Sequence, residues 1–226
     1  MKAVPECVGI IMDGNRRWAR ARGLPTLLGH EKGFRKVKEA LSWCDEAGVS
    51  HLIVYAFSTE NWNRSKEEVS YLMDLVRLLL TEETAVLAAE GYRLRCVGDR
   101  SRLPRDIVEL IETSEASTRS GTRSMLVVAL SYGGRAEILH AVRALLKEPP
   151  PELSEGVFSQ KLWSAGVPDP DLIVHTGGEK RLSGFLTWQS VYSELFFSDT
   201  FWPDFSKEEF RGILSEFAAR ERRMGK

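Results

Sequence analysis

Short apolar runs alternate along this chain with longer segments of helical periodicity, and this alternation restricts the possible folds more than any other feature. Each run has the length and composition of a strand that is buried on both faces of a sheet. The longest runs, Leu52–Phe57 and Met125–Leu130, have six residues each, far too few to span a membrane. Because strands that alternate with helices form parallel sheets, we expect an α/β fold with a mostly parallel central sheet and helices on both faces.

The expected elements follow one another without an internal repeat or a low-complexity segment. The proline run at 149–151 is too short for a domain linker, so we expect one domain over residues 1–226. Strands are expected at about 8–12, 52–57, 93–97, 124–131 and 172–175, followed by an apolar segment at 185–197. Helices are expected at about 30–47, 66–90, 104–117, 159–165 and 207–222, with a short helix from residue 15 and another that ends near 147.

The charge balance and the cysteines exclude several classes of protein. The 31 basic and 32 acidic residues give a net charge of −1, so no overall field attracts nucleic acid. Cys7, Cys44 and Cys96 are far apart and form no C-x-x-C pair, which argues against a zinc site or a disulfide framework. The first residues lack the pattern of a signal peptide. We therefore expect a cytoplasmic protein with no nucleic acid partner.

The stretch from 8 to 30 contains the strongest functional signal. Its apolar run ends at Asp13, which is followed by Gly14, Asn15 and a cluster of four arginines, Arg16, Arg17, Arg20 and Arg22. A carboxylate at the carboxyl end of a strand, beside a basic helix start, lies where open α/β sheets bind ligands. The pattern favours Mg²⁺ on Asp13 and phosphate oxygens on backbone N–H groups and guanidinium groups. A strand, a turn and a solvated basic helix account equally well for the same residues.

Two further polar loops, at 58–64 and 176–183, follow expected strands and should emerge at the same sheet edge as Asp13. The familiar phosphate motifs are missing, since the chain has no G-x-x-x-x-G-K-[ST] and no G-x-G-x-x-G after its first strand. Adjacent aspartates are also missing, which disfavours the all-helical prenyl synthases. No G-x-S-x-G elbow supports a serine hydrolase.

Five separated motifs, in the same order, resemble those of the cis-prenyltransferases. They are IIMDGNRRWA at 10–19, GH at 29–30, YAFSTENWNR at 55–64, YGGR at 132–135 and GGEKRLSGFLTWQSVYSELFF at 177–197. The resemblance implies a six-stranded, mostly parallel sheet flanked by helices, with a hydrophobic tunnel. It also implies a homodimer that uses Mg²⁺ to condense isopentenyl diphosphate with an allylic prenyl diphosphate, such as farnesyl diphosphate, in cis geometry.

The resemblance assigns roles to particular residues of this chain. Asp13 is the catalytic aspartate, which holds Mg²⁺ and assists proton removal, and Glu194 completes the metal site across the homodimer interface. The other catalytic positions are His30 and Asn61. The residues implied for the allylic diphosphate are Gly14, Asn15, Arg16, Arg17, His30 and Arg64. The residues implied for isopentenyl diphosphate are Ser58, Trp62, His175, Arg181 and Ser183.

The growing product needs an apolar channel, and two expected helices could line one. Phe34, Val37 and Leu41 form one apolar stripe, and Leu72, Val76 and Leu79 form another. An ordinary hydrophobic core accounts for much of both stripes. Since nothing in the chain inserts into a bilayer, we expect at most peripheral membrane contact, driven by the product.

Four positions depart from the family pattern. Cys7 replaces a common histidine, Thr26 and His175 each replace an arginine that contacts a diphosphate, and Gly184 replaces a common asparagine. The loss of one charge-assisted phosphate contact costs roughly 1.5–3 kcal/mol. Two alternatives therefore stay open: irregular, head-to-middle coupling of dimethylallyl diphosphate, and a non-catalytic partner subunit of a prenyltransferase. The intact Asp13 motif favours ordinary elongation.

Overall fold

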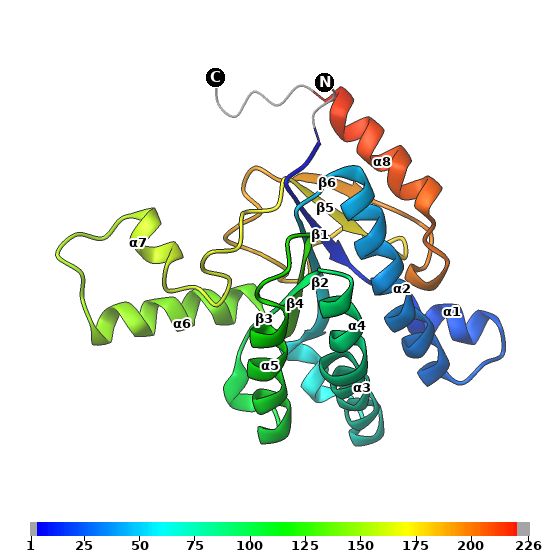
Figure 1. The fold of residues 1–226 in the computed structure, drawn as a ribbon, viewed down its shortest axis with the longest axis horizontal. Coiled ribbons are helices and arrows are strands. Elements are labelled where there is room, and N and C mark those ends of the chain that lie inside the picture. Colours follow the sequence, from blue (N-terminus) through cyan, green and yellow to red (C-terminus); the bar gives the residue numbers. More distant parts are fainter. Residues whose placement is uncertain (1–3, 221–226) are drawn as a thin grey trace.

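The computed structural model describes residues 4–220, which form one α/β domain around a six-stranded sheet (Figure 1). The strand order is β3-β4-β2-β1-β5-β6 and every neighbouring pair is parallel. The strands are β1 (Cys7–Ile11), β2 (His51–Ser58), β3 (Arg93–Val97), β4 (Met125–Tyr132), β5 (Leu172–His175) and β6 (Glu194–Phe197). The expected parallel sheet is therefore confirmed, and all its carboxyl ends lie at one edge.

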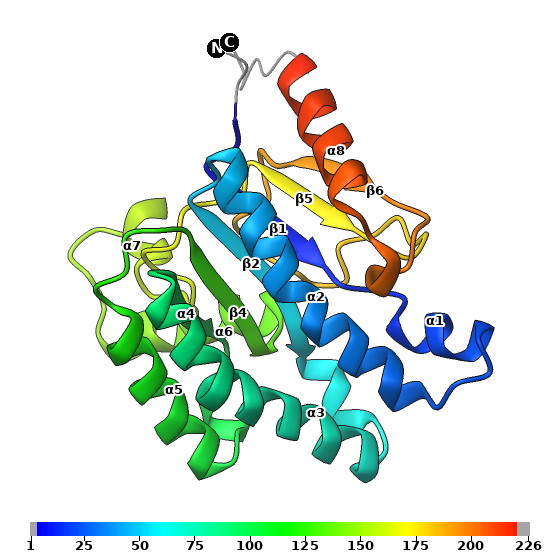
Figure 2. The same ribbon diagram turned by 45° about the vertical axis from the view of Figure 1, so that its right-hand side comes forward.

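Helices cover one face of the sheet, where five of them pack on alternate strand residues such as Val8 and Ile10 (Figure 2). They are α2 (Thr26–Ala47), α3 (Lys66–Leu78), α4 (Thr84–Ala89), α5 (Arg105–Thr118) and α8 (Lys207–Ala219). The opposite face packs mainly on Trp163, Phe185 and Leu186, which lie outside helices and strands. The expected layer of helices is thus present on one face, whereas irregular segments cover most of the other.

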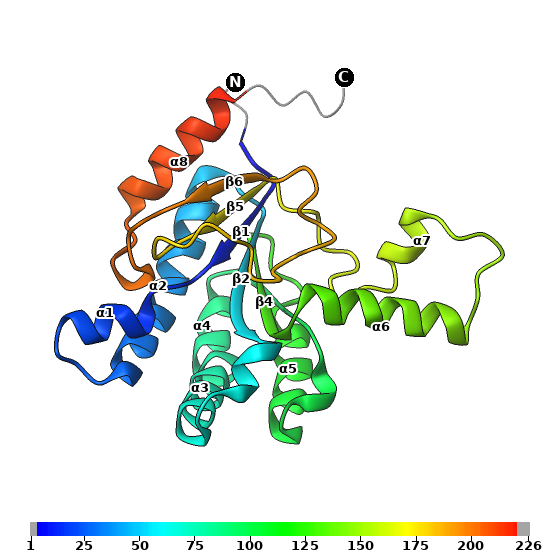
Figure 3. The ribbon, with the colours of Figure 1, turned by 180° about the vertical axis from the view of Figure 1, so that it is seen from behind.

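Two helices lie at the side of the molecule, away from the helical layer (Figure 3). They are α6 (Gly134–Lys147), which leaves the carboxyl end of β4, and the short α7 (Glu155–Ser159). The predicted helix at 159–165 is wrong. The Ser154 side chain accepts a hydrogen bond from Val157 N and so starts the helix before residue 159.

Two other helix boundaries differ from the prediction. The helix expected from residue 30 starts at Thr26, because Pro25 occupies the position before its first turn. The helix expected over 66–90 is interrupted by a π-helical turn, Leu79–Glu83, where Thr84 Oγ1 donates to Leu79 O. The expected end of the last helix at 222 lies outside the described residues.

Glycines of α2 allow the loop after β1 and the following helix α1 (Asn15–Ala21) to pack directly on it. A Cβ atom at Gly29 would lie 2.0 Å from Asn15 O, and one at Gly33 would lie 2.3 Å from Asn15 Oδ1. The buried Trp202 adds two hydrogen bonds, from Nε1 to Gly33 O (2.8 Å) and from its backbone N to Asp13 O (3.0 Å). Together these contacts fix residues 13–15 at the edge of the sheet.

Candidate active site

Asp13 lies just beyond β1, and its carboxylate makes three polar contacts. Its Oδ1 accepts a hydrogen bond from Gly14 N (2.6 Å), and its Oδ2 lies 3.1 Å from an Arg17 nitrogen and 3.5 Å from His175 Nε2. Burial raises the pKa of this carboxyl, but His175, the Gly14 N–H and the Arg17 charge outweigh it, so the pKa lies below its usual value. Asp13 is therefore an ionised carboxylate at neutral pH.

The loop after β5 holds the Asp13 backbone from the other side. Thr176 Oγ1 donates to Asp13 O (2.9 Å) and accepts from Asp13 N (3.1 Å). Gly177 follows with φ +86°, and a Cβ atom there would lie 3.1 Å from Asp13 O and 2.8 Å from an Arg17 nitrogen. Only glycine permits so close an approach with this backbone conformation.

A polar pocket of about 560 Å³ opens beside Asp13 at the carboxyl edge of the sheet. It brings together six of the residues predicted from the sequence: Asp13, Ser58, Asn61, Arg64, His175 and Ser183. Arg135, at the start of α6, also lines this pocket. Arg135 follows β4, just as the predicted loops follow other strands. The argument that residues after parallel strands meet at one sheet edge would have identified it if it had been applied to β4 as well.

Trp62 is directed away from the polar pocket. Its Nε1 donates to Ser131 Oγ (3.1 Å), and its ring packs edge-on against Phe57 with centroids 4.8 Å apart. In the same turn, Asn61 Oδ1 accepts from Ser58 N (3.1 Å). The structure thus gives Trp62 a packing role, and the loop that contains it is held by local hydrogen bonds.

Glu179 joins two of the predicted arginines at the mouth of the site. Its carboxylate lies 3.6 Å from an Arg17 nitrogen and accepts a hydrogen bond from Arg181 (2.6 Å). Arg181 is mostly exposed, with 60% of its side chain accessible. Because exposed ion pairs contribute little stability, an incoming diphosphate can replace this carboxylate on both guanidinium groups.

The carboxylate of Glu68 contacts a second group of residues predicted from the sequence. Its carboxylate lies 3.1 Å from His30 Nε2, 2.9 Å from an Arg64 nitrogen and 3.8 Å from an Arg16 nitrogen. Burial lowers the pKa of His30 despite the nearby Glu68, so the imidazole is neutral at pH 7. The sequence prediction missed Glu68, although its position four residues after Arg64, in the first turn of the expected helix at 66–90, was a usable signal.

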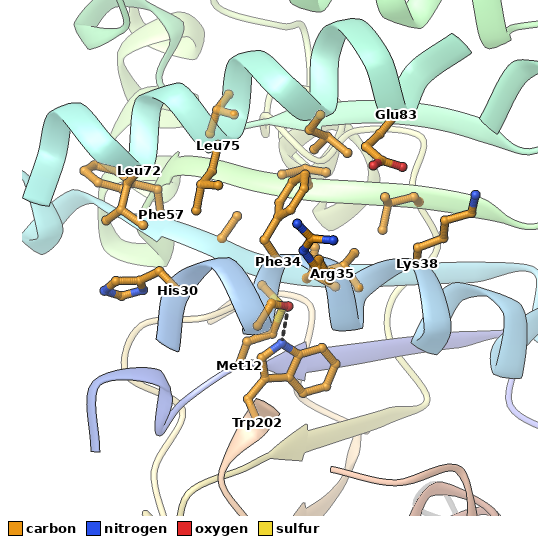
Figure 4. Close-up of a pocket in the computed structure, with 18 of the residues that line it drawn as sticks. Met12, His30, Phe34, Arg35, Lys38, Phe57, Leu72, Leu75, Glu83 and Trp202 are labelled. Carbon is orange, nitrogen blue, oxygen red and sulfur yellow. Dashed lines mark hydrogen bonds between the residues drawn. The ribbon is translucent and has the colours of Figure 1, made fainter. Parts of the chain in front are cut away.

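An apolar pocket of about 350 Å³ lies between α2 and α3, next to the polar one. Figure 4 shows His30 at one end, Phe34 in the middle, and Lys38 and Glu83 at the other end. Met12 lines both pockets, so the apolar space begins beside the residue that precedes Asp13. Asn15 also lines it, and its Nδ2 donates to Met12 O (3.3 Å).

Glu194 is separate from all these residues. It starts β6 opposite Leu172, which in turn pairs with Val8, and it accepts a hydrogen bond from Arg220 (2.6 Å). Asp13 follows Val8 by five residues, so Glu194 lies about 16 Å further back along the strand direction. Within one subunit, Glu194 and Asp13 therefore cannot bind the same ion.

A metal at this site would take part of its coordination from the substrate. Within residues 4–220, no three His, Cys, Asp or Glu side chains are grouped to hold a metal ion. The donors present are the half-exposed Asp13 carboxylate and the His175 imidazole, which fit a divalent ion whose other ligands are diphosphate oxygens and water. In the same part of the chain, no helix has the length and apolar character needed to cross a membrane.

Comparison with known proteins reveals relatives over nearly the whole chain. A family model for undecaprenyl diphosphate synthases matches residues 11–225. An isoprenyl transferase from Aquifex aeolicus is 46% identical over 223 residues, which cover 99% of this chain and 96% of the relative. An isoprenyl transferase from Rhizobium meliloti is 46% identical over 228 residues, which cover 98% of this chain and 92% of the relative.

Two solved structures share the fold. Lavandulyl diphosphate synthase from Lavandula x intermedia, in complex with dimethylallyl diphosphate, superposes with a TM-score of 0.93 at 30% identity and covers 99% of both chains. A probable undecaprenyl diphosphate synthase from Campylobacter jejuni superposes with a TM-score of 0.84 at 34% identity and covers both chains completely.

Proposed function

Since this chain belongs to the undecaprenyl diphosphate synthase family of isoprenyl transferases, we propose that it adds isopentenyl diphosphate to an allylic diphosphate in cis geometry. The observation that supports this most directly is the pair of adjoining pockets that share Met12. One is polar and rimmed by arginines, as a diphosphate requires. The other is apolar, as a prenyl chain requires, so one substrate can occupy both.

The reaction joins two carbon skeletons and releases pyrophosphate. The double bond of isopentenyl diphosphate attacks C1 of the allylic substrate, the C1–O bond breaks toward the leaving pyrophosphate, and a proton is lost from C2. Arg17 and Arg64 neutralise the negative charge that grows on the leaving group, and Arg181 holds the diphosphate of isopentenyl diphosphate. Gly14, Asn15 and Arg16 position the allylic diphosphate, Ser58 and Ser183 position isopentenyl diphosphate, and Asn61 is a further catalytic residue. The ionised Asp13 assists removal of the proton.

We propose that Asp13 holds Mg²⁺, which when bound screens the diphosphate charge. The neutral His30, held by Glu68, lies at one end of the apolar pocket, where it would contact the allylic end of the substrate. The enzyme is proposed to be cytoplasmic and to meet a membrane only at its surface, when a long product must leave.

The test is incubation of the purified chain with Mg²⁺, labelled isopentenyl diphosphate and dimethylallyl, geranyl or farnesyl diphosphate in turn. Chromatography after dephosphorylation should show a ladder of cis-prenols, which gives chain length and preferred primer together. A chain that consumes neither five-carbon diphosphate would contradict the proposal and would point to a non-catalytic partner subunit.

A second candidate function is irregular coupling of two dimethylallyl units. It is favoured by the TM-score of 0.93 to lavandulyl diphosphate synthase and by the replacement of two expected arginines with Thr26 and His175. The same assay separates the candidates. A ten-carbon product from dimethylallyl diphosphate alone, without isopentenyl incorporation, would establish irregular coupling.

Replacement of Phe34 with alanine should lengthen the products. Phe34 lies in the middle of the apolar pocket, and the ring that is removed is about as large as one isoprene unit (Figure 4). We expect the most abundant product to grow by at least one unit, as measured by chromatography of the dephosphorylated products. Leu28→Ala is the matched control on the same helix, because Leu28 is exposed and does not line the pocket. Equal product lengths for wild type and Phe34→Ala would argue against a chain in this pocket.

Apolar side chains at the β6 edge and on α6 support a homodimer. The exposed ones are Leu139, Val142, Leu146, Val191, Tyr192, Leu195 and Phe197. Val191 is 73% exposed, and a glutamate there should leave a monomer in light scattering, because it places a charge in an apolar interface. Val86→Glu, at an exposed position of α4 in the helical layer, should remain dimeric. A dimeric Val191→Glu variant would exclude this surface.

A mixing experiment tests whether Glu194 serves the partner's site. Asp13→Asn and Glu194→Gln should each be inactive alone. In a mixed dimer, one of the two sites then combines an intact Asp13 with an intact Glu194 from the other subunit, so activity should return after subunit exchange. If Glu194 supports only its own subunit, for example through Arg220, mixing will restore nothing.

A further inference from the structure

His175 has one ring nitrogen engaged and one that is not. Its Nδ1 donates a hydrogen bond to the Arg181 carbonyl oxygen, which can only accept. In its neutral form, a ring held in this way presents a lone pair at Nε2. Within the described chain, no group hydrogen-bonds to that nitrogen, although His175 is only 1% exposed.

The free nitrogen faces the carboxylate of Asp13, with 3.5 Å between His175 Nε2 and Asp13 Oδ2. In the neutral form of the ring both atoms are acceptors, and a cation placed between them satisfies both. Ligand atoms at about 2.1 Å from one metal ion are about 3.0 Å apart at a right angle and about 3.4 Å apart at a tetrahedral angle. The observed separation is thus a suitable bite for two ligands of a single ion.

We infer that Asp13 Oδ2 and His175 Nε2 together ligate one divalent ion, and that the imidazole shifts the preferred ion from Mg²⁺ toward Mn²⁺, Co²⁺ or Zn²⁺. Imidazole nitrogen suits transition metals, whereas Mg²⁺ takes oxygen ligands. The Arg181 carbonyl fixes the ring orientation from behind, as the outer partners of metal-bound histidines do. The ion is the one required by the proposed function, so the inference rests on that function for its role.

The residue type at position 175 is decisive for this site. The arginine that the family pattern would place here stays protonated and cannot donate a lone pair to a metal. In this chain the imidazole therefore replaces a phosphate contact with a metal ligand. Position 175 thus binds the metal ion in this chain, whereas the arginine of the family pattern binds the diphosphate of the substrate.

Arg17 is the competing cation at the same oxygen, 3.1 Å from Asp13 Oδ2. Its guanidinium also lies 3.6 Å from Glu179 and 5.4 Å from the centre of the Phe201 ring. Because the side chain is half-exposed and has these other contacts, it can leave Asp13 when an ion arrives. Diphosphate oxygens and water would complete the coordination.

The test uses Mn²⁺ as the probe, with the full chain and inorganic pyrophosphate. Pulsed electron paramagnetic resonance should show coupling between Mn²⁺ and one imidazole nitrogen in the wild type. The coupling should vanish in His175→Gln and in His175→Arg, while His51→Gln, at the opposite sheet edge, keeps it. By titration, His175→Gln should lower the affinity for Mn²⁺ at least about tenfold, with a smaller change for Mg²⁺.

The outcomes separate this inference from the proposed function. Mn²⁺ bound without nitrogen coupling in the wild type, or no Mn²⁺ bound at all, would overturn the metal site even if prenyl transfer is observed. Nitrogen coupling that is lost in both His175 variants supports the metal site even if the chain transfers no prenyl group. His175→Arg serves as a check in case His175→Gln misfolds, because arginine is the residue that the family pattern has at this position and the fold should therefore accept it.

Discussion

Replacement of Asp13 with asparagine is expected to lower kcat by about 10³-fold or more. The substitution keeps the shape of the side chain but removes its negative charge, and with it the contact with Arg17, the proposed metal ligand and the group proposed to assist proton loss. Pyrophosphate release measures kcat. Stability should change by less than about 1 kcal/mol, because Asp13 is half-exposed and its ion pair is screened by solvent.

Asp99→Asn is the control for this loss. Asp99 also follows a strand at the same sheet edge, but it only caps a short turn by accepting a hydrogen bond from Ser101 N (3.0 Å). The Asp99→Asn variant should therefore retain full activity. An Asp13→Asn variant with normal thermal unfolding and nearly normal kcat would exclude Asp13 from the chemistry.

Replacement of Trp202 with alanine is expected to lower the free energy of unfolding by about 3–5 kcal/mol. Trp202 is completely buried and lies against Phe205, and its Nε1 donates to Gly33 O under the apolar pocket. The substitution removes a large side chain from the core and leaves that carbonyl without its donor. Chemical denaturation measures the loss.

Two further variants separate the contribution of packing from that of the hydrogen bond and of burial. Trp202→Phe retains most of the volume and loses the hydrogen bond, so its cost should be about 1–2 kcal/mol. Trp18→Ala, at a partly exposed position where Nε1 donates to Asp204, should cost less than Trp202→Ala. Equal losses for the alanine and phenylalanine variants of Trp202 would show that packing contributes little there.

The sequence predicted the sheet and the position of Asp13 well, because both depend on local patterns. Apolar runs identify buried strands, and parallel pairing then places residues such as Ser58 and His175 at one edge. Helix ends were less predictable, since Pro25 and Ser154 act through single hydrogen bonds or single dihedral angles. The prediction that helices cover both faces failed in part, because nothing local distinguishes a covering helix from a covering loop.

The partners of the site residues could not be predicted, since they depend on where side chains point. Trp62 belongs to a motif associated with the site, yet its indole packs on Phe57. The sequence could not identify Glu68 as a partner of His30, because the two residues belong to different helices, α2 and α3, that meet only in the folded chain. The orientation of His175 toward Asp13 likewise depends on the Arg181 carbonyl, a contact between the end of β5 and the loop that follows it.

The central position of β1 has a consequence for how the protein is made. β1 is synthesised first, but one of its two neighbours, β5, and the contacts from Thr176 and Trp202 to Asp13 come from the last part of the chain. A growing chain therefore holds β1 with one open edge until β5 has been made, and open edges promote aggregation. Slow pairing across such long sequence separations means that the surroundings of Asp13 are complete only late in folding.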